Sequence, residues 1–94
     1  MADQNQDTYL LTYTYVEDMA ERRGPYREEH LAKIRAERDA GRITLAGALG
    51  TPPSGGAMVW TGVTPEDIER FTAADPYVIN GLVTAQRIVR WNLV

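Results

Sequence analysis

The segment TYLLTYTYV, residues 8–16, decides the fold of this 94-residue chain. It is rich in β-branched and aromatic residues, which favour an extended strand. Alternate residues of a strand point to opposite faces, so Tyr9, Leu11, Tyr13 and Tyr15 share one face, and Leu10, Thr12, Thr14 and Val16 share the other. Neither set is plainly polar, which indicates that both faces of this strand are covered.

A helix is predicted after a charged connection over residues 17–24. Pro25 suits the first turn of a helix, where its missing N–H is not needed, and Gly41 is a suitable stop after Ala40. Arg27, Leu31, Ile34 and Arg38 mark one stripe of this helix at helical spacing, and His30 flanks the stripe.

The second half of the chain predicts two strands, a short helix and a final strand. The strands cover residues 42–49 and 57–63, with Met58 and Trp60 on one face of the second and Val59 and Val63 on the other, and they are joined by the turn-rich loop Gly50–Gly56 (GTPPSGG). Thr64 is a good N-cap for the helix, which buries Ile68 and Phe71 and is broken at Asp75–Pro76. The last strand is predicted over residues 82–94.

The resulting order β-α-β-β-α-β is that of a ferredoxin-like α+β domain, in which four antiparallel strands carry both helices on one face. The opposite sheet face is left without cover, although its residues are apolar. A second copy packed against it would bury this surface, so we expect a homodimer through the open sheet face, forming a dimeric α/β barrel.

Composition limits the function classes. Residues 1–7 are expected to be a disordered tail and residues 8–94 a single domain. The chain has no cysteine and one histidine, so no disulfide, thiolate nucleophile, metal site or bound cofactor is expected. A net charge of −3 does not favour nucleic-acid binding, and no segment is apolar enough for a membrane span. The polar, acidic N-terminus is unlike a signal peptide, so a cytoplasmic protein is expected.

The connectivity brings two polar residues towards each other. The first helix starts at the sheet end where the second helix finishes, so His30 and Asp75 are expected to meet there. A histidine oriented by a carboxylate is a common general base. No nucleophile accompanies the pair, which favours proton transfer on a small anionic substrate over acyl transfer.

Structural interpretations of the same residues stay open. Asp75 followed by Pro76 is also an N-cap followed by the first helical residue, and His30 is also a half-exposed polar side chain. The tyrosines of residues 9–15 also suit the core and the dimer interface, and Arg22, Arg23 and Arg27 also suit a solvated surface.

Three short elements together resemble the YciI-like family of YCII-related domains. They are Arg27-Glu28-Glu29-His30-Leu31, then Leu45-Ala46-Gly47 after Gly41, and Ala74-Asp75-Pro76-Tyr77 followed by Gly81. The resemblance extends over residues 8–93 and implies a ferredoxin-like dimer. It also implies that His30 and Asp75 are the catalytic pair. Arg27, Tyr13 and Tyr77 are then expected to contact the substrate.

Relatives with this resemblance include muconolactone-processing dehalogenases, in which proton abstraction from a lactone precedes halide loss. The chain departs from the family pattern at Ala48, where proline is usual, and in the loop Gly50–Gly56, so no relative's substrate is carried over. Two functions remain. One is a small enzyme of lyase, isomerase or dehalogenase type that uses the His/Asp pair, and the other is a non-catalytic ligand-binding or accessory dimerisation domain.

Overall fold

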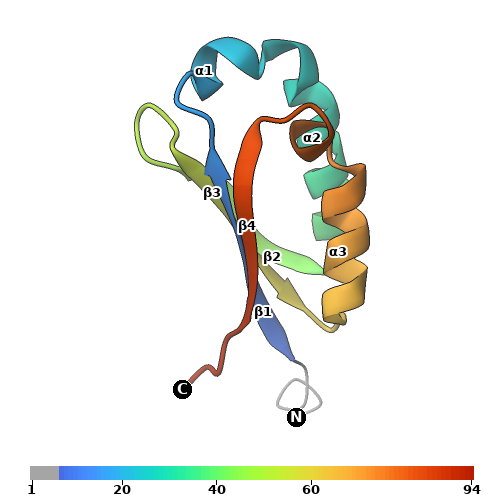
Figure 1. Ribbon diagram of the computed structural model, residues 1–94. Helices are drawn as coiled ribbons and strands as arrows, with labels where there is room; N and C mark the ends of the chain where they lie inside the picture. Colours follow the sequence, from blue (N-terminus) through green and yellow to red (C-terminus); the bar gives the residue numbers. More distant parts are fainter. Residues whose placement is uncertain (1–6) are drawn as a thin grey trace.

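The structure is a computed structural model that describes residues 7–94. Four strands form one antiparallel sheet in the order β2-β3-β1-β4, with β1 at Thr8–Tyr15, β2 at Ile43–Leu49, β3 at Gly55–Thr61 and β4 at Val83–Arg90. The long helices α2 (Gly24–Asp39) and α3 (Pro65–Ala74) lie on the same face of this sheet (Figure 1). The predicted ferredoxin-like α+β fold is therefore confirmed.

Two short helices were not in the predicted element order, although a helix starting at Pro76 was one of the interpretations left open. Helix α1 (Met19–Arg22) lies within the expected charged connection, and it buries Met19 against Tyr77 and Leu82. Helix α4 (Pro76–Ile79) follows α3 directly, because Asp75 leaves the helical conformation and caps the new helix. Residues 1–6 of the predicted tail lie outside the described residues. Asp7, the first described residue, accepts a hydrogen bond from the backbone N–H of Gly62.

Several strand boundaries differ from the prediction, and two of the differences have a clear structural cause. Strand β3 starts at Gly55, inside the predicted loop, because a glycine there lets the backbone approach the carbonyl of Tyr13 more closely than a Cβ would permit. Strand β4 ends at Arg90 and not at Val94. It pairs only with β1, whose first residue is Thr8, and the Trp91 N–H makes the last bond to the Thr8 carbonyl.

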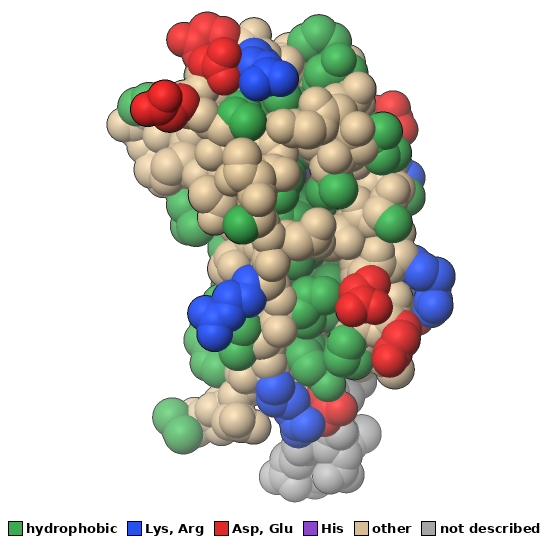
Figure 2. All heavy atoms as spheres, in the orientation of Figure 1, with side chains coloured by type: hydrophobic (Ala, Val, Ile, Leu, Met, Phe, Trp, Pro, Cys, Tyr) green, Lys and Arg blue, Asp and Glu red, His purple; other side chains and the backbone are tan. Residues whose placement is uncertain are grey.

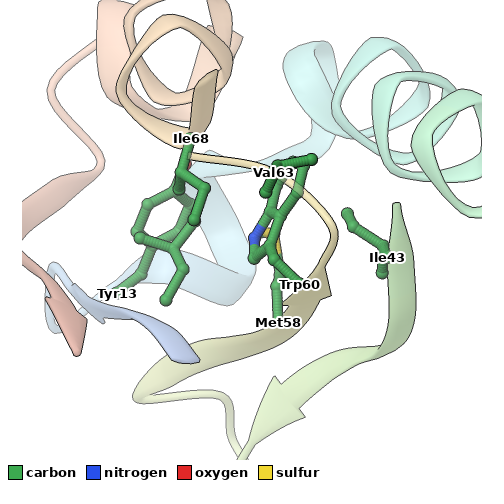
Figure 3. Packing of buried hydrophobic residues seen from close by; sticks show 7 residues of the cluster. Tyr13, Ile43, Met58, Trp60, Val63 and Ile68 are labelled. Carbon is green, nitrogen blue, oxygen red and sulfur yellow. The ribbon is translucent and has the colours of Figure 1, made fainter. Parts of the chain in front are cut away.

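The core lies between the sheet and the helices (Figure 3). Leu11 and Tyr13 of β1 point into it beside Met58 and Trp60 of β3. Val63, predicted to lie on the same face as Val59, is instead buried in this core, since the turn at Gly62 interrupts the alternation of the strand.

The opposite sheet face carries small and apolar residues. One row across the sheet is formed by Leu45, Val59, Leu10 and Val89, which are cross-strand partners. Leu45 is 69% exposed and Val89 is 37% exposed. Figure 2 shows hydrophobic side chains at the surface, among them those at the C-terminal end of the chain, where Leu93 and Val94 are exposed. The two-sided apolar character predicted for the sheet is thus observed.

Candidate functional site

Asp75 is the most deeply placed charged residue of the site. It sits at the junction of α3 and α4 in an extended conformation, with φ −74° and ψ 123°, and its side chain is fully buried. Its Oδ1 atom accepts the backbone N–H of Tyr77 at 3.0 Å, which caps α4, while Pro76 occupies the first helical position. The cap fixes the direction in which the carboxylate points.

His30 meets this carboxylate from the first half of α2. Its Nδ1 atom lies 2.9 Å from Oδ1 and 3.0 Å from Oδ2 of Asp75. The imidazole stacks on the ring of Tyr77, with centroids 3.7 Å apart and an interplanar angle of 11°. His30 is the one fully buried residue of α2, whereas Ile34 and Tyr26 of the same helix are partly buried against the core. The structure thus brings the two residues together, as the connectivity predicted.

Tyr13 completes the hydrogen bonding of Asp75. Its hydroxyl donates to Oδ2 at 2.9 Å. Burial, followed by the charge of Asp75 and the hydrogen bond to it, raises the pKa of Tyr13 far above its ordinary value, so the hydroxyl stays a donor. An ionised carboxylate only accepts hydrogen bonds. Tyr13, Tyr77 and His30 all direct a polar atom at the Asp75 carboxylate. As an acceptor, this carboxylate requires a proton on Nδ1 of His30.

The other ring nitrogen of His30, Nε2, carries a lone pair whenever the imidazole is neutral. Nε2 forms no hydrogen bond with the described residues, and Trp60 Nε1 is the one enclosed side-chain atom among them without a partner. Nε2 is therefore open to its surroundings. His30 lines a groove of about 510 Å³ between α2 and β2, which we call the α2–β2 groove. A neutral imidazole with Nδ1–H held by a carboxylate and Nε2 facing a cavity has the arrangement of a general base.

The α2–β2 groove is strongly cationic. The charged residues that line it are four arginines, Arg23, Arg27, Arg35 and Arg38, and no Asp or Glu lines it. None of the four forms an ion pair within the described part of the chain, whereas four arginines elsewhere do: Arg22, Arg42, Arg70 and Arg90. An anion entering the groove meets guanidinium groups that have no competing carboxylate.

Tyr15 also lines the groove, beside Tyr77. Burial, with smaller contributions from Tyr77 and Asp75, raises the pKa of Tyr15 to about 12, although Arg23 opposes the shift. Its hydroxyl has no hydrogen-bond partner among residues 7–94. Tyr15 is therefore a protonated donor available to a ligand in the groove at neutral pH.

The structure separates the three residues that were expected to contact substrate. Arg27 and Tyr77 line the groove with His30, but Tyr13 does not; its hydroxyl is directed to Asp75 instead. Sequence reasoning missed Tyr15 as a groove residue, and it missed Arg35. The signal for the arginines was present, because Arg23, Arg27, Arg35 and Arg38 recur at helical spacing.

Within residues 7–94, no group of three or more His, Cys, Asp or Glu side chains is arranged to hold a metal ion. In the same part of the chain, no helix combines the length and the hydrophobicity needed to cross a bilayer.

A four-stranded antiparallel sheet covered on one face by two helices, with a buried histidine–carboxylate pair beside a groove, defines a ferredoxin-like α+β domain with a ligand-accessible site. Residues 8–92 match the profile of the YCII-related domain, and the chain belongs to this family. The family expected from the three sequence elements is thereby confirmed.

Solved structures share this fold at low sequence identity. The 5-chloro-2-hydroxyhydroquinone dehydrochlorinase of Burkholderia phenoliruptrix, solved with 2,5-dihydroxybenzoquinone, is 17% identical with a TM-score of 0.79, over 93% of this chain and 95% of that one. A putative antibiotic biosynthesis monooxygenase from Bacteroides thetaiotaomicron is 14% identical with a TM-score of 0.57, over 98% and 92%. A NIPSNAP family protein of unknown function from Agrobacterium tumefaciens is 12% identical with a TM-score of 0.56, over 95% and 88%. Comparison with curated proteins finds no match.

Proposed function

We propose that this protein is a small enzyme that moves a proton on a small anionic metabolite, with His30 as the general base and Asp75 as its orienting partner. One observation carries the proposal: Nδ1 of His30 lies 2.9 Å from a buried carboxylate, and the same side chain lines a groove that four arginines also line. The resemblance to a dehydrochlorinase supports the same reaction type, since elimination of HCl removes a proton together with chloride.

The proposed step is a proton transfer. Nε2 takes a proton from a carbon next to a carbonyl group, and the electron pair of the broken C–H bond moves onto the carbonyl oxygen. In this proposal Asp75 stabilises the imidazolium that forms, and the hydroxyl of Tyr15, which lines the same groove as His30, donates to the oxygen on which charge develops. Return of the proton to another atom gives isomerisation, and loss of a leaving group from the neighbouring carbon gives elimination.

Proton exchange tests this step whichever overall reaction follows it. A panel of small carboxylates with acidic C–H bonds is incubated with the protein in D₂O, and loss of the C–H signal is followed by NMR. We expect exchange with the wild-type protein and a decrease of about 10²–10⁴-fold in His30→Gln, the usual contribution of a general base. The matched control is Glu29→Gln, an exposed neighbour on α2 that should leave exchange unchanged.

Two outcomes would contradict the enzymatic proposal. One is exchange that is equally fast in His30→Gln and the wild type. The other is saturable ligand binding with no exchange for any member of the panel, which would favour the non-catalytic ligand-binding domain.

We further propose that the protein is a homodimer paired through the open sheet face. The cross-strand row of Leu45, Val59, Leu10 and Val89 supports this, because a monomer would leave it in contact with water. Val89→Glu should dissociate the dimer, whereas Gln86→Glu, on the opposite face of the same strand, should not. Sedimentation at micromolar concentration measures both, and a wild-type mass near 10.5 kDa would refute the dimer.

A further inference from the structure

We infer that the α2–β2 groove binds an elongated dianion, a molecule with one anionic group at each end and an apolar middle. The inference rests on the proposed function and names its substrate class. The four groove arginines are not evenly spread along α2. They form an N-terminal pair, Arg23 and Arg27, and a C-terminal pair, Arg35 and Arg38.

The spacing of the two pairs sets the size of the ligand. Arg35 lies eight positions after Arg27, which corresponds to about 12 Å along a helix with a rise of about 1.5 Å per residue. Arginine side chains are long enough to bend towards each other, so the anionic groups they bind lie closer together than this. A single carboxylate or phosphate does not occupy both pairs in an extended groove of this kind.

The wall between the two pairs is apolar. Leu31 and Ile34 lie between them on α2, and both are half-buried at the groove. Across the groove, β2 and β3 contribute Ala46, Ala48 and Met58. A ligand with a hydrocarbon or planar unsaturated centre would therefore keep that centre in contact with nonpolar atoms, while its ends reach the guanidinium groups.

The C-terminal pair is unfavourable within the helix. Like charges three or four residues apart destabilise a helix by about 0.2–0.5 kcal/mol per pair, and Arg35 and Arg38 lie three residues apart in α2, whereas Arg23 is its N-cap. Elsewhere in the chain, arginines at the same spacings have acidic partners instead: Arg22 with Asp18 and Arg70 with Asp67. The groove arginines have no acidic partner among the described residues, and in the proposed complex the carboxylates of the ligand provide one.

His30 lies within this span, three residues after Arg27 and five before Arg35. An anion held by the N-terminal pair therefore places the adjoining carbon of the ligand near Nε2, and the far anion fixes its orientation. The N-terminal pair would bind the group next to the reacting carbon, and the C-terminal pair would select for length.

Calorimetric titration with simple carboxylates tests this assignment. The probes are succinate, adipate and suberate, which have four, six and eight carbons, and hexanoate as the monoanion that matches adipate. We expect one of the two longer dianions to bind about fivefold or more tightly than hexanoate, the ratio that about 1 kcal/mol from a solvent-exposed ion pair provides. The double variant Arg35→Ala/Arg38→Ala should bind adipate and hexanoate equally, with the affinity for hexanoate retained.

Two controls separate recognition from overall charge. Arg22→Ala removes a cation beside the groove that does not line it, and Lys33→Ala removes one from α2 that lines a different cavity. Neither should change the ratio of adipate to hexanoate affinity. Equal binding of dianions and hexanoate by the wild type, or an equal loss in the control variants, would overturn the inference. Such a result would not refute the proton exchange by His30, because that assay does not require the ligand to be a dianion.

Discussion

The stability of Asp75→Ala distinguishes two roles for Asp75. In one it only caps helix α4, and in the other it also holds together a buried hydrogen-bond network. As a cap alone, Asp75 would contribute about 1 kcal/mol to the free energy of unfolding, the usual value for loss of an N-cap. The structure gives the carboxylate three donors instead: the Tyr77 N–H, the Tyr13 hydroxyl and His30 Nδ1, at 2.9–3.0 Å.

The expected cost of Asp75→Ala follows from these contacts. Tyr13, His30 and Tyr77 are all nearly inaccessible to solvent, with exposed fractions of 3%, 4% and 2%. A buried donor that loses its partner costs about 1–3 kcal/mol. His30 can partly escape this by moving its proton to Nε2, so we expect a total of about 3–5 kcal/mol. That is a large share of the roughly 5–15 kcal/mol by which a domain is stable.

Urea unfolding at one fixed protein concentration measures this difference, at a pH above about 6.5 so that histidine is neutral in the unfolded chain. Asp75→Asn is the companion variant, because asparagine is an equally good cap of nearly the same size. It should lose less than Asp75→Ala, about 1–2 kcal/mol, and it stays measurable if the alanine variant does not fold. A loss of only about 1 kcal/mol in Asp75→Ala, with Asp75→Asn like the wild type, would refute the network and leave the cap.

Three further predictions follow from the same surroundings. The pKa of Tyr15 is raised to about 12 in the folded protein, so its contribution to the free energy of unfolding is complete below about pH 10 and is lost as the pH rises towards 12. Urea unfolding across this range should therefore show a smaller decrease in the free energy of unfolding for Tyr15→Phe than for the wild type. A Cβ at Gly56 would lie 2.7 Å from the Tyr15 hydroxyl, so Gly56→Ala should weaken binding of adipate in calorimetry, whereas Gly55→Ala, which meets backbone of β1, should mainly lower stability. The chain has one histidine, so ¹⁵N NMR reports its tautomer without assignment, and the Nδ1–H form should dominate in the wild type but not in Asp75→Asn.

The fold was predictable from the order of its elements, because a β-α-β-β-α-β chain has few ways to place both helices on one sheet. The orientation of β1 in the sheet was not predictable from its sequence. Both of its faces carry large side chains, so the alternation alone did not show that Leu11 and Tyr13 face the helices. That choice places the Tyr13 hydroxyl at Asp75, and Tyr13 is not among the residues that line the groove.

The α2–β2 groove was likewise not predictable from helix periodicity. The stripe that contains Leu31 and Ile34 would ordinarily be buried against the sheet. The strand opposite carries Ala46 and Ala48 at these positions, and these small side chains leave space that larger ones would fill. Whether such a space stays open depends on the distance between helix and sheet, which the packing of the whole core sets.

The capping contact of Asp75 is compatible with the catalytic role that we propose for it. The same Oδ1 atom accepts the Tyr77 N–H and lies 2.9 Å from His30 Nδ1, so the cap holds the carboxylate in the position that the imidazole needs. Because α4 begins at Pro76, the ring of Tyr77 is brought onto the face of His30. A general base has to keep one orientation through each proton transfer, and here a turn of backbone, a stacked ring and a buried tyrosine supply that constraint together. The features that made Asp75 look like an ordinary cap are therefore the ones that suit it to orient a base.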